Sequence, residues 1–186
     1  MPPRVFLVRH GRPAVDPGAA PHTWQLHPAG LADIETLRDS GRLPADARWF
    51  SSPEPKALDT ARGLTRSDIT VVHDLREHER EVTHWFDHAD EFADTVRRAF
   101  DRPDERAVPE WEPLASTRDR LLPAVRRILT DHPDEEVVLV GHGTAWTLLV
   151  AELTRARPDL EAWAALRMPD LWEVGQPAGG QIDGCA

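Results

Sequence analysis

Short, continuous runs of apolar residues recur along the chain and predict strands that are buried on both faces of a sheet. Val5–Val8 and Val137–Val140 are the clearest of these runs. Residues 48–51 and 69–72 follow the same pattern, and residues 171–174 predict an edge strand. Such runs indicate a central sheet whose strands are largely parallel.

Segments with helical spacing of apolar residues separate these runs. The predicted helices cover residues 28–40, 53–66, 87–100, 117–131, 144–154 and 158–166. For the second of them, Ser52 is the expected N-cap and Pro53 the first-turn proline. Residues 102–113 contain three prolines and predict a loop or flexible insertion. The alternation of strands and helices predicts an α/β fold, a three-layer αβα sandwich around a mostly parallel central sheet.

The length of 186 residues fits one domain, which we place at residues 1–175. The last residues, 176–186, are rich in glycine and are expected to be a disordered tail. We find no signal peptide, and the longest apolar stretch is interrupted by a Gly-His-Gly turn, so it does not read as a membrane span. A cytoplasmic protein is the resulting prediction.

Charge narrows the classes of partner. The chain holds 22 basic and 32 acidic residues, a net charge of -10, which disfavours binding to nucleic acid or to an anionic membrane. A phosphorylated ligand would then need a local concentration of positive charge. Arginine supplies nearly all the basic residues, and Lys56 is the single lysine.

Two strand-to-loop elbows echo one another. Val5–Val8 leads into Arg9-His10-Gly11, and Val137–Val140 leads into Gly141-His142-Gly143. In an open α/β sheet ligands bind beyond the carboxyl ends of the strands. If the two strands are neighbours, the two imidazoles meet at that edge. A strand-exit turn with a partly buried histidine explains either elbow alone, whereas the pair favours a functional site.

Four segments together resemble the histidine phosphatase superfamily, which has the phosphoglycerate mutase-like fold. They are residues 7–11 with the Arg-His-Gly motif, residues 51–61 with Ser-Ser-Pro and Thr-Ala, residues 75–77 with Leu-Arg-Glu, and residues 140–143 with Val-Gly-His-Gly. Their order and spacing agree with the family across nearly the whole chain. The resemblance implies a phosphatase that carries phosphate transiently on a histidine.

The resemblance assigns His10 as the nucleophile that accepts the phosphoryl group. It implies that Arg9 holds two phosphate oxygens with its planar fork and that His142 stabilises the transition state from the other side. Glu77 is the implied general acid, with Glu79 as the alternative, and this role requires a raised pKa. Because the protein itself supplies this positive charge, we expect no metal and no other cofactor.

The chain departs from the family pattern in the second block, where Lys56 stands at a position that usually holds arginine. Lysine keeps the charge but loses the bidentate fork. We expect Lys56 to bind phosphate from the first turn of its helix, and Arg62 to face solvent. Arg12 is a further candidate for phosphate binding. For Arg12, and for Arg80 close to Glu77, a contact in the site and a surface salt bridge are equally compatible with the sequence.

The function predicted is hydrolysis of a phosphomonoester, with a small phosphorylated metabolite as the partner. Three alternatives remain open: phosphoryl transfer of the mutase type, a phosphohistidine protein phosphatase, and a phosphate-binding pseudo-enzyme. The short region 88–115 favours hydrolysis over the mutase reaction, because mutases of this family tend to carry insertions. The oligomeric state is left open.

Overall fold

A five-stranded sheet forms the centre of the fold in the computed structural model, which describes residues 4–81, 86 and 88–175. Its strands are β1 (Arg4–Arg9), β2 (Arg48–Ser51), β3 (Ile69–Val71), β4 (Val137–Gly141) and β5 (Asp170–Gly175). They lie in the order β3-β2-β4-β1-β5. All neighbouring pairs are parallel except β1 and β5. The prediction of a mostly parallel sheet with an edge strand near its C-terminal end is confirmed.

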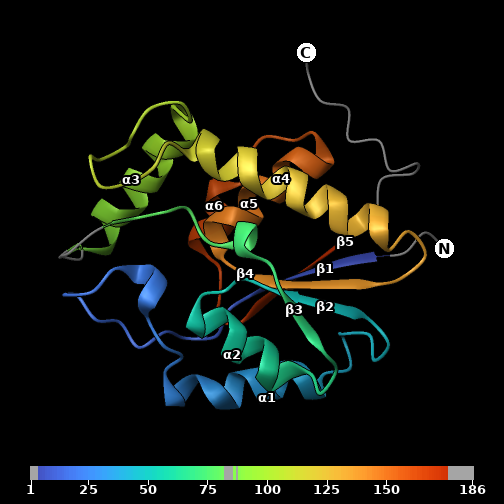
Figure 1. Cartoon of the computed structure of the whole chain (residues 1–186). Coiled ribbons are helices and arrows are strands. Elements are labelled where there is room, and N and C mark those ends of the chain that lie inside the picture. The colour runs from blue at the N-terminus through green and yellow to red at the C-terminus, as the bar shows by residue number, and fades with distance from the viewer. Residues whose placement is uncertain (1–3, 82–85, 87, 176–186) are drawn as a thin grey trace.

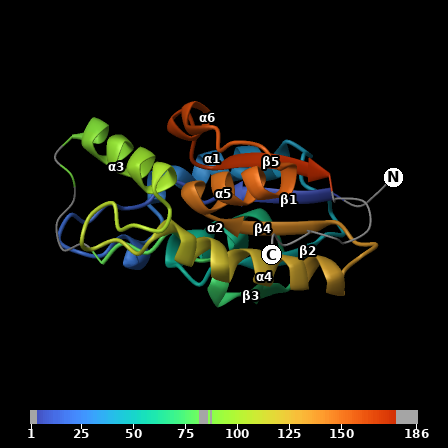
Figure 2. The ribbon, with the colours of Figure 1, turned by 90° about the horizontal axis from the view of Figure 1, so that it is seen from above.

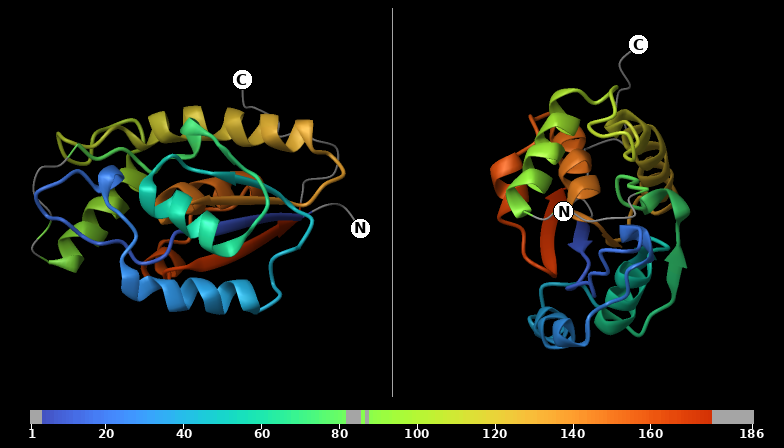
Figure 3. Two further views of the ribbon diagram at one scale, coloured as in Figure 1. Left: turned by 60° about the horizontal axis from the view of Figure 1, so that its bottom comes forward. Right: turned by 90° about the vertical axis from the view of Figure 1, so that its left-hand side faces the viewer.

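Helices cover both faces of this sheet, which gives the three layers predicted from the sequence (Figure 1). Helices α1 (Leu31–Asp39) and α2 (Pro55–Leu64) pack on one face, and α4 (Leu114–Asp131) and α5 (Gly143–Thr154) pack on the other. In the left panel of Figure 3, α4 runs along one side of the sheet and α1 along the opposite side.

The alternation of side chains along β1 explains these two layers. Val5 and Leu7 belong to the apolar cluster under α4 and α5, and Phe6 and Val8 belong to the cluster over α1 and α2. All four are essentially inaccessible to solvent. The continuous apolar run is therefore the signature of a strand that is buried on both faces.

The remaining helices lie toward the ends of the sheet. They are α3 (Ala89–Asp101) and the short α6 (Leu160–Ala164). Figure 2 shows α3 beyond the carboxyl ends of the parallel strands, at the side where the loop after β1 also lies. Three 3₁₀ turns complete the described elements: η1 (Pro21–Thr23), η2 (Pro28–Gly30) and η3 (His73–Leu75).

The proline-rich segment 102–113 is a loop, as predicted, but it is firmly attached to the rest of the fold. Trp111 is completely buried. Arg80 and Trp111 form an antiparallel bridge, flanked by a hydrogen bond from Glu81 N to Glu110 O and one from Glu112 N to Glu79 O. The expectation of a flexible insertion is therefore wrong.

Helix α2 begins later than the sequence suggests. Pro55 is its first residue and Glu54 its N-cap, so Ser52 does not cap it. The Ser52 hydroxyl instead accepts a hydrogen bond from Glu54 N and lies 2.8 Å from His142 Nε2. The predicted helix at 158–166 also proves shorter than expected. The predicted tail, residues 176–186, lies outside the described residues.

The carboxyl ends of β1 and β4 are fixed in register. Arg9 lies opposite Gly141, and His10 N donates a hydrogen bond of 2.8 Å to Gly141 O. Gly141 leaves room for the buried Trp146 ring, whose indole N–H donates to Val8 O at 2.8 Å. A Cβ atom at position 141 would lie 2.5 Å from Trp146 Cζ2, so only glycine fits here.

We therefore expect Gly141→Ala to destabilise the protein by about 1–3 kcal/mol, the usual cost of overpacking a rigid core. Urea unfolding followed by tryptophan fluorescence would measure this loss. Gly175→Ala is the matched control, because a Cβ atom there has no neighbour within 4 Å. Equal free energies of unfolding for the two variants would contradict the packing role of Gly141.

Candidate active site

The two elbows bring His10 and His142 together at the carboxyl edge of the sheet. Their ring centroids are 5.3 Å apart and their planes are inclined by 62°. Both side chains are buried, with 6% and 0% of their surface exposed. The expectation that β1 and β4 are neighbours, which would place the imidazoles side by side, is confirmed.

Hydrogen bonds orient the His10 ring. Its Nδ1 lies 2.7 Å from Gly11 O, which can only accept, so Nδ1 carries the proton. In the neutral ring this leaves a lone pair on Nε2. The elbow itself is anchored to α2, because Gly11 N donates to Thr60 Oγ1 at 2.8 Å. The ring is thus held with an unprotonated nitrogen available for attack.

The surroundings of His10 keep it neutral. Burial lowers the pKa of His10 well below its ordinary value of 6.5, and the nearby His142 and Lys56 lower it further. The hydrogen bond to Gly11 O raises the pKa, but by less. A neutral imidazole at physiological pH is the protonation state that a nucleophile requires.

His142 faces residues from β2 and the start of α2. Its Nε2 lies 2.8 Å from Ser52 Oγ and 3.3 Å from Glu54 Oε1. Its Nδ1 is buried and has no hydrogen-bond partner among the described residues. Burial, followed by Lys56, lowers the pKa of His142 well below its usual range, and Glu77 opposes this shift.

Arg9 extends from the end of β1 toward the segment before β5. Its Nη1 donates to Leu166 O at 3.0 Å and to Arg167 O at 3.3 Å. The guanidinium packs against Gly143, where a Cβ atom would lie 3.2 Å from Arg9 Nε. Burial lowers the pKa of Arg9, while Glu77 and Asp170 raise it. The backbone carbonyls leave Arg9 Nε without a partner among the described residues.

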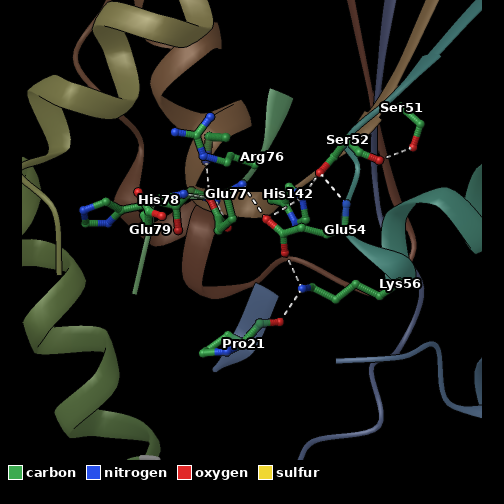
Figure 4. A network of polar contacts seen from close by, with 12 residues as sticks. Pro21, Ser51, Ser52, Glu54, Lys56, Arg76, Glu77, His78, Glu79 and His142 are labelled. Atoms are coloured by element: carbon green, nitrogen blue, oxygen red, sulfur yellow. Dashed lines mark hydrogen bonds and ion pairs between the residues drawn. The ribbon is translucent and has the colours of Figure 1, made fainter. Parts of the chain in front are cut away.

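Lys56 lies in the first turn of α2 and is almost completely buried. Its ammonium donates to Pro21 O at 2.7 Å and forms an ion pair of 2.5 Å with Glu54 Oε2 (Figure 4). Arg62 pairs with Asp59 on the exposed face of the same helix, as expected of a solvated residue. Glu54 is not among the site residues predicted from the sequence. Its signal was an acidic residue two positions before the lone lysine.

The Glu77 carboxylate lies at the N-terminus of α5. Oε1 accepts hydrogen bonds of 2.9 Å from His78 N and Ala145 N, and Oε2 accepts one of 3.2 Å from Thr144 N. Backbone N–H groups at a helix N-terminus stabilise the charged form of a carboxyl group. The Glu77 side chain is therefore held against the first turn of α5, the helix that follows His142.

The expectation of a raised pKa for Glu77 is wrong. Burial does raise it, as expected for a carboxyl group. Arg80, His142 and the His78 N–H group together outweigh burial, so the pKa of Glu77 falls below its ordinary value. The cause is the opposite charge and the hydrogen bonds, which nearby acidic residues do not offset.

Arg80 is buried near His142. Its guanidinium carbon lies 4.4 Å from the Trp111 ring centroid and 5.0 Å from that of Phe92, and Nη2 donates to Thr144 Oγ1 at 3.0 Å. Burial lowers the pKa of Arg80, whereas Glu77 raises it. Of the two alternatives for Arg80, the surface salt bridge is excluded by its 7% exposure.

Arg12 is not brought to this group. Its side chain is exposed, and it does not line the cavity around His10. Arg12 O accepts a hydrogen bond from His27 N, and the next residue, Pro13, bridges to Leu26 and lines the cavity where Arg12 does not. The prediction that Arg12 binds phosphate in this cavity is therefore wrong.

A cavity of about 810 Å³ opens over the two histidines. Its lining comes from both elbows, the loop after β1, the start of α2 and the segment after β3. Trp24, Phe92, Trp163 and Met168 form part of its apolar wall. This volume lies in the range of small-molecule sites, roughly 300–1,000 Å³. In the part of the chain that the structure describes, no three or more His, Cys, Asp or Glu side chains gather to hold a metal ion.

The part of the chain described in the structure contains no helix long and apolar enough to cross a bilayer. The cytoplasmic location stays a prediction.

Solved structures with the same fold include several phosphatases. The mycobacterial glucosyl-3-phosphoglycerate phosphatase superposes with a TM-score of 0.72 at 22% identity, covering 93% of this chain and 90% of its own. Phosphoserine phosphatase from Entamoeba histolytica gives 0.70 at 15%, with coverages of 91% and 89%. Phosphoglycerate mutase from Bacillus anthracis gives 0.73 at 16%, with coverages of 97% and 94%.

Sequence comparison agrees with the fold. The chain is 24% identical over 173 residues to the uncharacterized phosphatase PhoE of Bacillus subtilis, covering 85% of this chain and 81% of that protein. The sequence profile of the histidine phosphatase superfamily, branch 1, matches residues 5–171, from β1 into β5. With both elbows and the intervening motifs inside that match, the chain belongs to the histidine phosphatase superfamily.

Proposed function

We propose that the protein hydrolyses a phosphomonoester through a phosphohistidine on His10. The observation that carries this proposal is the state of the His10 ring: neutral, buried, and bonded through Nδ1 to Gly11 O, so that Nε2 keeps its lone pair. A second imidazole lies 5.3 Å away between ring centroids. Membership of a phosphatase superfamily supports the same reaction class.

In the first step His10 Nε2 attacks phosphorus, and the bond from phosphorus to the ester oxygen breaks. The leaving oxygen takes a proton, which we assign to Glu77. In the second step water attacks the phosphohistidine, the nitrogen–phosphorus bond breaks, and the proton from water returns to Glu77. One ester and one water thus become an alcohol and inorganic phosphate, and both side chains recover their starting state.

Three cationic or donor groups of the site suit the phosphoryl oxygens. We assign Arg9 and Lys56 to the non-bridging oxygens and His142 to the charge that develops in the transition state. Arg9 Nε is buried with no hydrogen-bond partner among the described residues, which suits a donor for such oxygens. With these groups the proposed reaction uses no metal ion.

The cavity suits a small phosphorylated metabolite. Its volume far exceeds that of a phosphoryl group, so space remains for the leaving group. Trp24 and Trp163 form part of the apolar wall of this space. The names of related proteins, among them glucosyl-3-phosphoglycerate phosphatase and phosphoserine phosphatase, are consistent with substrates of this size.

Replacement of the nucleophile tests the proposal directly. We expect His10→Ala to lose at least about 1000-fold in kcat against an aryl phosphate with chelator present, because no other group forms the covalent intermediate. The wild type should retain phosphate label from the substrate on His10 after denaturation in alkali, where phosphohistidine survives. Mass spectrometry would locate the label.

His27→Ala is a suitable control, because this histidine is exposed and lies outside the cavity. It should keep wild-type kcat and label. Activity that survives the loss of His10, or that requires added metal, would overturn the proposed mechanism.

The role of Glu77 predicts a dependence on the leaving group. An alkyl phosphate needs a proton on its leaving oxygen, whereas 4-nitrophenyl phosphate does not. We expect Glu77→Gln to lower kcat/KM for an alkyl phosphate by about 100- to 10,000-fold, and that for 4-nitrophenyl phosphate by much less. Equal losses for the two substrates would exclude proton donation by Glu77.

The pH profile gives a second test of the same role. The pKa of Glu77 is lowered from 4.5, so its acid form, which is the donor, decreases about tenfold for each pH unit above that pKa. For an alkyl phosphate, the ratio of wild-type to Glu77→Gln kcat/KM should therefore decrease as pH rises through the acidic range. The ratio also cancels the titration of the substrate itself. A ratio that rises with pH would contradict this assignment.

A further inference from the structure

Glu54 places a negative charge inside the site that we assign to phosphate. The side chain is 5% exposed. Its Oε2 pairs with Lys56 Nζ at 2.5 Å, and its Oε1 accepts a hydrogen bond of 2.8 Å from Glu77 N. Oε1 also lies 3.3 Å from His142 Nε2, and these contacts are drawn in Figure 4. A buried carboxylate that pairs with Lys56, the lysine assigned to phosphate, opposes the binding of an anion there.

Glu54 does not serve its own helix. It occupies the N-cap position of α2, yet its side chain makes no capping hydrogen bond. Prolines on both sides, Pro53 and Pro55, restrict the backbone there, and Glu54 adopts an extended conformation with φ -65° and ψ 132°. The carboxylate therefore does not bond to the backbone N–H groups of the first turn. It contacts the side chains of Lys56 and His142.

The groups facing the carboxylate come from three parts of the fold. Lys56 belongs to α2, His142 to the elbow between β4 and α5, and Glu77 and Arg80 to the segment after η3. Within the described residues, Glu54 forms ion-pair contacts with Lys56 and with His142. The Glu54 carboxylate thus neutralises part of the positive charge of Lys56 that a phosphoryl group would otherwise contact.

We propose that Glu54 competes with the phosphoryl group for Lys56 and thereby weakens the binding of phosphate and speeds its release. This inference rests on the proposed function, since it takes Lys56 and Arg9 as the phosphate site. A dianion that bonds to the Lys56 ammonium brings its charge close to the Glu54 carboxylate. Like charges repel strongly where burial excludes water. Phosphate, as the product, is then held less tightly than Arg9 and Lys56 alone would hold it.

Sulfate is the probe for the test, because it is a tetrahedral dianion that does not titrate across the pH range used. We expect Glu54→Gln to bind sulfate at least tenfold more tightly than the wild type. The amide keeps the size of the side chain and an acceptor oxygen but removes the charge. Product inhibition by inorganic phosphate should also appear at a concentration at least tenfold lower. Sulfate binding that is unchanged or weaker in this variant would overturn the inference and make Glu54 a group that merely orients Lys56.

Glu79→Gln is the matched control, because Glu79 also lines the cavity but forms no ion pair with Lys56. It removes the same charge from the same cavity, and we expect its sulfate affinity to change by less than about threefold. If Glu79→Gln tightened sulfate binding as much as Glu54→Gln, the effect would be one of net charge, and the specific competition at Lys56 would be refuted.

A measurement on the wild type avoids dependence on the folding of a variant with an unpaired buried lysine. Lys56 is the single lysine of the chain, so protein labelled with ¹⁵N-lysine gives one side-chain ammonium signal in NMR spectra. We expect this signal to shift on titration with sulfate, and to reach its endpoint as the site saturates, because the ammonium exchanges its carboxylate partner for the anion. A signal that stays fixed while sulfate saturates the site would refute the inference.

Arg9→Met separates the failure of this inference from the failure of the proposed function. If the phosphate site is assigned correctly, this variant should lose sulfate binding, and sulfate should compete with an aryl phosphate in the wild type. Sulfate binding that survives Arg9→Met and does not compete with substrate would place the anion elsewhere, so that the proposed function fails. Binding that requires Arg9 but is not tightened by Glu54→Gln would leave the proposed function standing and remove only the role of Glu54.

Discussion

The parallel pairing of β1 with β4 is the constraint on which the rest of the site depends. It sets Arg9 opposite Gly141 and continues through the hydrogen bond from His10 N to Gly141 O. Two imidazoles from distant parts of the chain therefore meet at the ends of two strands that are hydrogen-bonded to each other. Each ring begins directly where its strand ends, so the precision of the ladder is passed on to the reacting groups.

Charge balance inside a buried site is the second organising feature. Arg9, Lys56 and Arg80 bring positive charge close to the two histidines, which favours neutral imidazoles. Glu54 and Glu77 return negative charge to the same volume. Such a mixture keeps the empty protein from carrying several uncompensated buried cations, whose desolvation would be costly. The site thus resolves a conflict between stability and affinity for anions.

The sequence predicted the layers and, on the condition that the strands before the two elbows are neighbours, the meeting of His10 and His142, because these follow from local patterns and from one strand pairing. It did not reveal the setting of Glu77, whose carboxylate accepts hydrogen bonds from N–H groups of α5 that lie far along the chain. Glu54 was missed for a similar reason, since its partner His142 is remote. The loop at 102–113 was predicted, but its attachment to the fold was not, because no local pattern indicates that Trp111 is buried.

The stacking of Arg80 between Trp111 and Thr144 has a mechanical consequence. Its guanidinium lies on the ring of Trp111 and close to that of Phe92, so it rests on α3 and on the loop after it. Its Nη2 hydrogen bond joins it to the first turn of α5, directly after His142. A displacement of α3 would therefore carry a full positive charge with it or strip that charge of its aromatic support. The position of the Arg80 charge near His142 therefore depends on how α3 packs against the rest of the fold.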